Sequence, residues 1–459
     1  MPRSPVSFLL AIVVFAGLLA IAPAEALAQA KASRLEYRER TLANGMRVLS
    51  AVDRSSPTVC INVWYHVGSK DDPDGRSGFA HLFEHMLFKG TRNMKDEQMD
   101  RLTEDVGGFN NAFTADDVTV YYEVVPSNYL ETLLWAEAER LSSLNVVDKN
   151  FLSERDVVKE EYRQSYLARP YGRLFLEIEK KSFTTHPYKR PGIGNIDELN
   201  AATIDDVRKF HADYYRPDNA TLVVVGDFDP KQLDAWVDKF FADIPKPSTP
   251  LARVTIQEPA RTAEQRHTVT APNVPLPAVA MTFLLPKQKH EDMYALRVAE
   301  SILSNGESSR LYNSLVYTKQ VASEASAQVD LREDASLFIL FAILAGGKTT
   351  AEGEEALLAE IKRMQDAPVT AAELEKAKNQ LVTAKLFELE TNNGKAEELG
   401  RSAVLYGDPN RINTDVEKLQ AVTAADIQRV MKKYFDPTNR VVLTYLPEPE
   451  AAAEGAPAK

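Results

Sequence analysis

Five consecutive residues, His81-Leu82-Phe83-Glu84-His85, carry the side chains best suited to catalysis in this chain. On a helix, residues four apart share a face one turn above each other, so both imidazoles can reach one metal ion. Glu84, three positions after His81, points to the same side of the helix. H-x-x-E-H is the zinc-hydrolase motif H-E-x-x-H in reversed order, so the segment predicts two zinc ligands and a carboxylate base.

A catalytic zinc ion takes three protein ligands and keeps one position open for water. His81 and His85 would supply two of the ligands, and Glu84 is needed as the base. We therefore expect the third ligand to be a carboxylate that a separate helix brings in. The predicted helix over residues 151–166 offers four candidates, which coordination chemistry alone does not separate: Glu154, Asp156, Glu160 and Glu161.

The stretch HLFEHMLFKGT, residues 81–91, resembles the signature of the pitrilysin/insulinase family of zinc metallopeptidases. This family includes the mitochondrial processing peptidases. Two short segments ahead of the motif, Gly68-Ser69 and Gly78-Phe79-Ala80, also match the family pattern. The resemblance covers nearly the whole chain after its N-terminal leader, and it implies a zinc-dependent peptide-bond hydrolase.

The resemblance also implies roles for individual residues. In the family the third zinc ligand is a Glu that follows the second His at the spacing found here between His85 and Glu161 (161 − 85 = 76). Glu154, two turns before Glu161 on the same helix face, matches a supporting Glu that orients a ligand. One Zn²⁺ per chain is therefore expected on His81, His85 and Glu161, with Glu84 as the general base.

The segment Gly107-Gly108-Phe109-Asn110-Asn111-Ala112-Phe113-Thr114 resembles a family segment that forms an edge strand beside the zinc ion. The edge of a sheet exposes N–H and C=O groups, to which an extended peptide can add as a further strand. Asn111 and Ala112 are the implied substrate contacts. The alternative interpretation of this segment is an ordinary hairpin edge.

One family feature is missing from the second half of the chain. Many active members carry there an Arg and a Tyr, seven residues apart, that reach the substrate. The lead-in Ser309-Arg310-Leu311 is present, but Val316 and Ser323 occupy the expected Arg and Tyr positions. Arg310 and Tyr317 are also seven apart and are a possible replacement pair, although they fall six residues early.

The resemblance further implies that one chain of two such units is half of a closed chamber. We therefore expect a heterodimer in which a homologous subunit without zinc ligands supplies the Arg/Tyr pair, with a homodimer as the alternative. The expected activity is hydrolysis of short or unfolded peptides. The alternatives are a dedicated processing peptidase for one precursor and a non-catalytic core or assembly subunit.

An internal repeat indicates how the chain is organised. Thr203 begins a predicted amphipathic helix that leads to Tyr-Arg-Pro-Asp-Asn219 and a β-branched strand, and Thr423 begins a similar series that leads to Phe-Asp-Pro-Thr-Asn439. The two copies keep a constant offset in the numbering (423 − 203 = 220 and 439 − 219 = 220). Each Thr is a typical helix N-cap. Two copies of one unit are the simplest explanation.

The predicted fold class is α+β, with two homologous domains in which antiparallel-type sheets are covered by helices. The counterpart of the metal helix, residues 297–301, keeps Glu300 but has no histidine, so the first domain is expected to be catalytic and the second structural. The predicted boundaries are 31–245 for the catalytic domain, 246–266 for a linker, 267–447 for the second domain and 448–459 for a disordered tail.

The N-terminal residues 1–30 have the features of a secretory signal peptide: Arg3, an apolar run over 8–22 and small-x-small cleavage signals that end at Ala28 and Ala30. We therefore expect a periplasmic protein, with an uncleaved anchor as the alternative. The 459 residues are 44% hydrophobic with a net charge of −12, which is an ordinary globular composition without the basic surface of a nucleic-acid-binding protein.

Two other residues are expected to be structural. Cys60 is the single cysteine, so no intrachain disulfide can form, and its neighbours predict a buried strand. His186, beside Pro187, is expected to be exposed and to serve packing rather than catalysis.

Overall fold

A computed structural model describes residues 34–449. The predicted signal peptide and all but two residues of the predicted tail therefore lie outside the described residues. Among residues 34–449, none of the helices combines the length and the apolar character that a membrane span requires.

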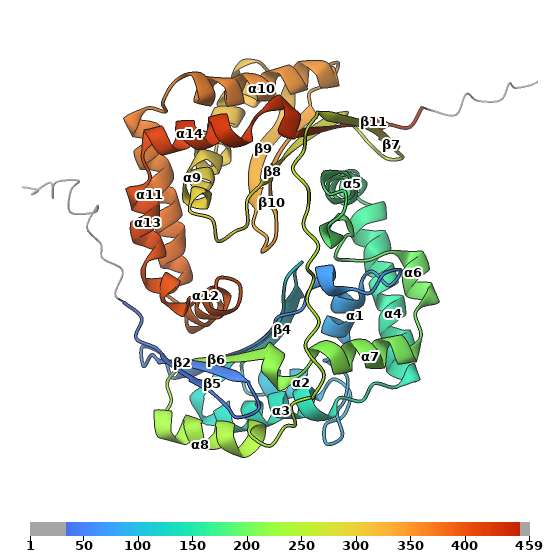
Figure 1. Cartoon of the computed structure of the whole chain (residues 1–459), viewed down its shortest axis with the longest axis vertical. Helices are drawn as coiled ribbons and strands as arrows, with labels where there is room; N and C mark the ends of the chain where they lie inside the picture. Colours follow the sequence, from blue (N-terminus) through green and yellow to red (C-terminus); the bar gives the residue numbers. More distant parts are fainter. Residues whose placement is uncertain (1–33, 450–459) are drawn as a thin grey trace, which may run out of the picture. The chain divides into compact units, whose positions relative to one another are not determined.

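The first half of the chain builds a six-stranded sheet and helices α1 to α8 (Figure 1). Its elements are β1 (Arg38–Thr41), β2 (Arg47–Val52), β3 (Thr58–Tyr65), α1 (Phe79–Met86), α2 (Gln98–Glu104), β4 (Phe109–Thr114), β5 (Thr119–Pro126), α3 (Leu130–Ser143), α4 (Asp148–Tyr162), α5 (Gly172–Ser182), α6 (Ile196–Ala201), α7 (Ile204–Tyr214), β6 (Ala220–Gly226) and α8 (Pro230–Phe241). The strand order is β1-β2-β6-β3-β5-β4, which leaves β4 at one edge. Only β2 and β6 pair in parallel.

The second half builds a five-stranded sheet of the same design. Its elements are β7 (Gln265–Ala271), β8 (Ala278–Leu285), α9 (Asp292–Ser304), β9 (Ala322–Asp330), β10 (Ser336–Leu344), α10 (Thr350–Asp366), α11 (Ala371–Glu388), α12 (Asn392–Val404), α13 (Asp415–Ala421), α14 (Ala424–Tyr434) and β11 (Arg440–Pro447). The strand order β7-β11-β8-β10-β9 repeats β2-β6-β3-β5-β4 of the first sheet, including its one parallel pair. The two-domain α+β prediction is confirmed.

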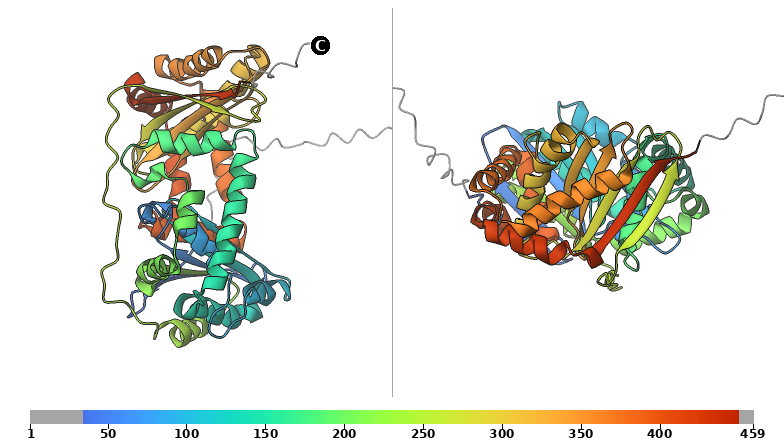
Figure 2. Two further views of the ribbon diagram at one scale, coloured as in Figure 1. Left: turned by 90° about the vertical axis from the view of Figure 1, so that its right-hand side faces the viewer. Right: turned by 90° about the horizontal axis from the view of Figure 1, so that it is seen from above.

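The segment between the two sheets, residues 242–264, contains no helix or strand and runs along one side of the molecule (Figure 2, left). Strand β7 begins at Gln265, two residues before the predicted start of the second domain at residue 267.

The internal repeat extends over most of each half. Strands β3 and β8, helices α7 and α14, and strands β6 and β11 all begin at the offset seen in the sequence (278 − 58 = 220, 424 − 204 = 220 and 440 − 220 = 220). Thr203 and Thr423 cap their helices as predicted, because each side chain accepts the N–H of an Asp three residues later. The two halves are therefore copies of one unit.

Helices α5 and α12 are the same element of the repeat, since they begin at the same offset (392 − 172 = 220), and each covers the sheet of the other half. Leu174 and Ile178 of α5 pack on β7, β8 and β11 of the second sheet. Ala396 and Leu399 of α12 pack on β2, β3, β5 and β6 of the first sheet. This exchange buries both faces of each sheet, which explains why the central strands are apolar almost without interruption.

Candidate metal centre

Helix α1 is held firmly at its N-terminus. Gly78 precedes the helix in the left-handed conformation (φ 94°), and a Cβ there would lie 3.0 Å from Cα of Gly194. Asp72 accepts the backbone N–H groups of Gly78 (2.6 Å) and Ala80 (2.8 Å), two of the donors that a helix leaves without intrahelical partners. The apolar face of α1 is fully buried: Phe79, Leu82, Phe83 and Met86. Its opposite face is turned toward α4.

The motif histidines and one carboxylate of α4 converge. Nε2 of His81 and Nε2 of His85 each lie 3.6 Å from Oε2 of Glu161. Within residues 34–449, this is the one group of three His, Cys, Asp or Glu side chains whose ligand atoms all lie within 4.8 Å of one another. Zinc bonds of about 2.1 Å in a tetrahedron separate neighbouring ligand atoms by about 3.4 Å. The donor set and its spacing therefore fit a zinc ion.

Glu154 lies on the other side of the His85 ring. Its Oε2 is 3.5 Å from Nδ1 of His85, and its Oε1 is 3.1 Å from Nζ of Lys89. A carboxylate at Nδ1 favours a proton on that nitrogen and leaves the lone pair of Nε2 directed at the cluster. This position suits the orienting role that the sequence resemblance implies for Glu154.

Glu84 lies beside the cluster in a pocket of about 390 Å³, which His81, Glu161 and Ala112 also line. The hydroxyl of Thr114 donates a hydrogen bond of 2.6 Å to Oε2 of Glu84. Burial raises the pKa of Glu84 above its usual range. The carboxylate is thus fixed in position and is more basic than an ordinary glutamate.

The charges of the three clustered residues depend on one another. Burial and the neighbouring His85 lower the pKa of His81 to about 4. Burial also lowers the pKa of His85, but the carboxylates of Glu154 and Glu161 outweigh it and raise this pKa to about 9. The hydrogen bond with His85 lowers the pKa of Glu161. In the metal-free cluster the positive charge of His85 therefore stabilises the Glu161 carboxylate, and a zinc ion would take the place of the proton on Nε2 of His85.

The predicted substrate-binding segment is β4. Because β4 pairs only with β5, its other edge is open in the sheet. Ala112 lines the pocket with Glu84, whereas Asn111 is exposed beside it. The side chain of Asn111 accepts the backbone N–H of Ala112 (2.8 Å). An extended peptide that pairs with Ala112 must therefore replace this local hydrogen bond.

The replacement pair considered in the sequence is not brought to this cluster. Arg310 forms an ion pair with Glu373 (2.7 Å) and lines a different pocket, and Tyr317 is 73% exposed. Val316 lies in the helical turn η7 (Tyr312–Thr318), and Ser323 lies in β9. Their side chains are an aliphatic group and a hydroxyl, and neither provides the guanidinium or the phenol of the family's pair.

Sequence reasoning missed a second set of carboxylates in the same pocket. Asp116 and Glu179 line it, and Arg332 of the second half lies 3.2 Å and 3.4 Å from them. Burial and the charge of Asp116 raise the pKa of Glu179 to about 8. No spacing in the sequence links these residues, because Asp116 follows β4, Glu179 lies on α5 and Arg332 comes from the second half.

Thr114 was also missed as a functional residue. It is the last residue of the Gly107–Thr114 resemblance, so that segment did contain the signal. Its hydrogen bond to Glu84 joins the edge strand to the metal helix.

Comparison with known proteins defines the class. The family model described as Insulinase (Peptidase family M16) matches residues 47–194, and the model described as Peptidase M16 inactive domain matches residues 201–381. The chain therefore belongs to peptidase family M16, the pitrilysin/insulinase family. The inactive-domain match begins at the end of the first half and extends into the second half, whose counterpart helix has no histidine.

Individual relatives are similar over nearly the whole chain. Zinc protease PqqE of Helicobacter pylori is 31% identical over 421 residues, which cover 90% of this chain and 93% of that protein. A probable mitochondrial-processing peptidase subunit beta of Arabidopsis thaliana is 25% identical, over 87% of this chain and 76% of that protein.

Solved structures share the fold. The crystal structure of a protease from Helicobacter pylori has a TM-score of 0.86 at 29% identity and covers 90% of this chain and 100% of that one. The periplasmic protease PqqL from Escherichia coli has a TM-score of 0.72 at 19% identity, and this chain matches 48% of its length. The fold therefore corresponds to about half of that longer protein.

Proposed function

We propose that this chain is a zinc-dependent endopeptidase that hydrolyses short or unfolded peptides, with one zinc ion held by His81, His85 and Glu161. The observation that carries the proposal is the convergence of three donor atoms within 4.8 Å, in a pocket that also contains Glu84. Membership of family M16 and the similarity to a protein named zinc protease PqqE support the same reaction class.

Each residue then has a defined task. A zinc ion bound here would lower the pKa of a bound water and polarise the scissile carbonyl group. Glu84 accepts a proton from that water and delivers it to the leaving amine. The raised pKa of Glu84 suits both proton transfers, because a carboxylate whose pKa lies closer to neutral pH accepts a proton more readily. Because the Thr114 hydroxyl donates a hydrogen bond to Oε2 of Glu84, Oε1 is the oxygen that is free to accept the proton of the water.

The substrate would lie along the open edge of β4 as an added strand, with Asn111 and Ala112 as its contacts. Pairing through backbone groups tolerates many side chains, which suits a peptidase of broad specificity. Ala112 supports this position because it lines the same pocket as Glu84 and Glu161.

A partner subunit is part of the proposal. We infer a heterodimer with a homologous chain that lacks zinc ligands and supplies the Arg/Tyr pair. Val316 and Ser323 stand at the expected positions of that pair, and Arg310 is held by Glu373. The match to 48% of the longer PqqL protein supports a half-sized unit, and a homodimer is the alternative. The predicted signal peptide and the similarity to PqqL, a periplasmic protease, support a periplasmic location.

A dedicated processing peptidase for one precursor is the second candidate, favoured by the similarity to a mitochondrial-processing peptidase subunit. A non-catalytic subunit fits less well, because the three donor atoms and Glu84 are all present in one pocket.

The test is to purify the mature chain, alone and with a homologous subunit, and to measure zinc content and cleavage of unstructured peptides. We expect about one zinc ion per chain in both the wild type and Glu84→Gln, and turnover only in the wild type. Absence of bound zinc in the wild type, or a comparable rate in Glu84→Gln, would contradict the proposal. Equal activity with and without the homologue would contradict only the heterodimer.

A further inference from the structure

Strand β4 separates two spaces, because its side chains alternate between the two faces of the first sheet. Ala112 packs in the core that contains α1, and Thr114 bonds to Glu84 on the same face. Phe113, between them, points to the opposite face, where it packs with Trp64 in the core that contains α12. The two rings meet edge to face, with centroids 6.2 Å apart and planes at 88°.

A second pocket, of about 400 Å³, lies on this opposite face. Four aromatic side chains line it: Trp64, Phe113, Tyr122 and Tyr406. Phe113 and Ala115 line both this pocket and the pocket that contains Glu84, so the two pockets share a wall formed by β4 and the residue after it.

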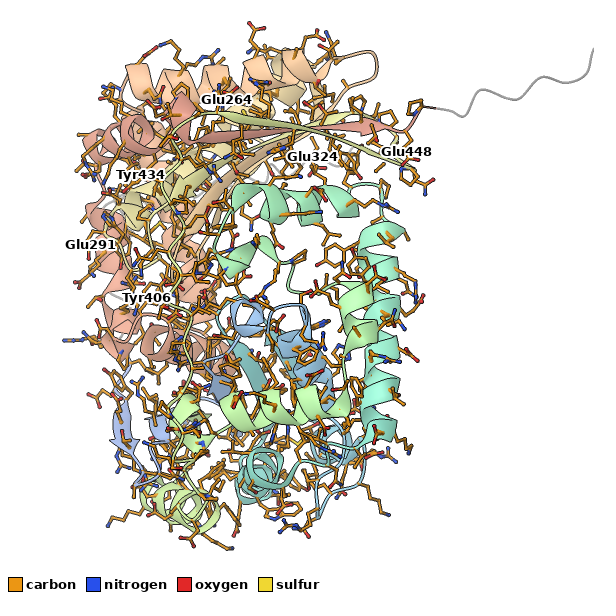
Figure 3. All side chains as sticks on the ribbon, turned by 45° about the vertical axis from the view of Figure 1, so that its right-hand side comes forward. Glu264, Glu291, Glu324, Tyr406, Tyr434 and Glu448 are labelled. Atoms are coloured by element: carbon orange, nitrogen blue, oxygen red, sulfur yellow. The ribbon has the colours of Figure 1, made fainter. Side chains whose placement is uncertain are left out.

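The helix exchange creates this second pocket. Tyr406, labelled in Figure 3, lies just beyond the end of α12 and brings its ring from the second half of the chain. Gly400 allows α12 to lie against the indole, since a Cβ there would be 2.1 Å from Nε1 of Trp64. At the rim, Arg401 donates a hydrogen bond to Glu397, so these two charges compensate each other and the pocket wall is mainly aromatic and aliphatic.

We propose that this aromatic pocket is a second substrate subsite, which takes an aromatic or large aliphatic side chain of a peptide lying along β4. The inference rests on the proposed function, because it requires that the substrate pairs with this strand. Successive side chains of an added strand point to opposite faces of the sheet. When one side chain enters the pocket beside Glu84, its neighbour therefore faces the aromatic pocket.

The two pockets select different chemistry. Four carboxylates line the pocket beside Glu84, and two of them, Asp116 and Glu179, pair with the buried Arg332; the other two are Glu84 and Glu161. The aromatic pocket offers ring faces and edges, which favour another aromatic ring beyond the gain from buried area. The two pockets would thus bind the side chains of two adjacent residues of one peptide.

The test uses a series of labelled peptides with a Ser/Thr/Gln background and a single Phe that is moved one position at a time. Binding to the zinc-loaded full-length chain carrying Glu84→Gln is measured by fluorescence anisotropy, so that the readout does not depend on turnover. We expect Phe to tighten binding about tenfold or more at one position, and to have little effect at the two adjacent positions. Equal effects at all positions would overturn the subsite.

Substitutions in the pocket make the test specific. Tyr406→Ala and, separately, Tyr122→Ala should lower the ratio of Phe-peptide to Ser-peptide affinity at the preferred position by about tenfold. Tyr317→Ala, at a 73% exposed tyrosine outside both pockets, should keep the wild-type ratio. An unchanged ratio in both pocket variants would refute the subsite. Failure to bind zinc or to cleave any peptide would instead count against the proposed function.

Discussion

Oε2 of Glu154 lies 3.5 Å from Nδ1 of His85, on the side of the imidazole that faces away from the cluster with Glu161. The two carboxylates are two turns apart on α4 and hold one ring between them. In the proposed zinc site, Glu161 would bind the metal and Glu154 would fix the tautomer and orientation of His85.

Replacing Glu154 with Gln should lower zinc affinity by about 10- to 100-fold without removing a ligand, because outer carboxylates contribute roughly that much. Competition with a chelator of known affinity measures this change. Asp156→Asn, at a 64% exposed side chain of the same helix, is the matched control and should bind zinc like the wild type. Identical zinc affinities for Glu154→Gln and Asp156→Asn would show that Glu154 does not orient His85.

Adjacent residues on α4 should behave differently toward zinc. Glu161→Gln should lose bound zinc on dialysis and should no longer gain thermal stability when zinc is added, because ligand binding to the folded state raises Tm. Glu160→Gln should retain both properties, since the Glu160 side chain is 56% exposed and faces Arg163. Zinc analysis and Tm measured with and without zinc test the pair. Retention of zinc by Glu161→Gln would exclude it as a ligand.

Stability should depend on pH through an ion pair between the halves. Lys395 of α12 pairs with Asp53, and this hydrogen bond lowers the pKa of Asp53 from 3.8 to about 2. A folded-state pKa below the unfolded value stabilises the fold at higher pH, and this stabilisation is lost as the pH falls from about 4 to 2. The difference in free energy of unfolding between wild type and Asp53→Asn should therefore shrink over that range.

Denaturant titrations at several pH values measure this difference. Asp243→Asn, at an exposed acid with no ion pair among the described residues, serves as the control. A difference for Asp53→Asn that stays constant down to a pH of about 2 would show that the ion pair contributes nothing.

The exchanged helix should be sensitive to volume at one glycine. Gly400→Ala places a methyl group 2.1 Å from Nε1 of the buried Trp64, so it should destabilise the fold by about 1–3 kcal/mol through overpacking. Gly346→Ala is the control, because a Cβ there meets nothing within 4 Å. Chemical denaturation of both variants measures the contrast. Equal free energies of unfolding for Gly400→Ala and Gly346→Ala would mean that α12 is not closely packed against the first sheet.

Sequence patterns were strongest where local rules act. The spacing of His81, Glu84 and His85 fixes their common face on any helix, and the N-cap threonines at 203 and 423 begin helices as predicted. Cys60 is buried in β3, as its neighbours indicated. The prediction that His186 is exposed was wrong: the ring is fully buried, and its Nδ1 accepts the N–H of Tyr188. A turn with proline does not reveal whether another segment will cover it.

By itself, the sequence determined the helix of the H-x-x-E-H motif and the apolar strands, because both follow from periodicity within a short segment. It also determined the duplication, because similar series of residues recur at a constant offset of 220. The tertiary structure decided that Thr114 meets Glu84, that Asp116 and Glu179 share their pocket, and that α5 and α12 each cover the other half's sheet. An amphipathic helix shows which of its faces is apolar but not which sheet that face will cover. That choice depends on packing between segments that lie far apart in the sequence.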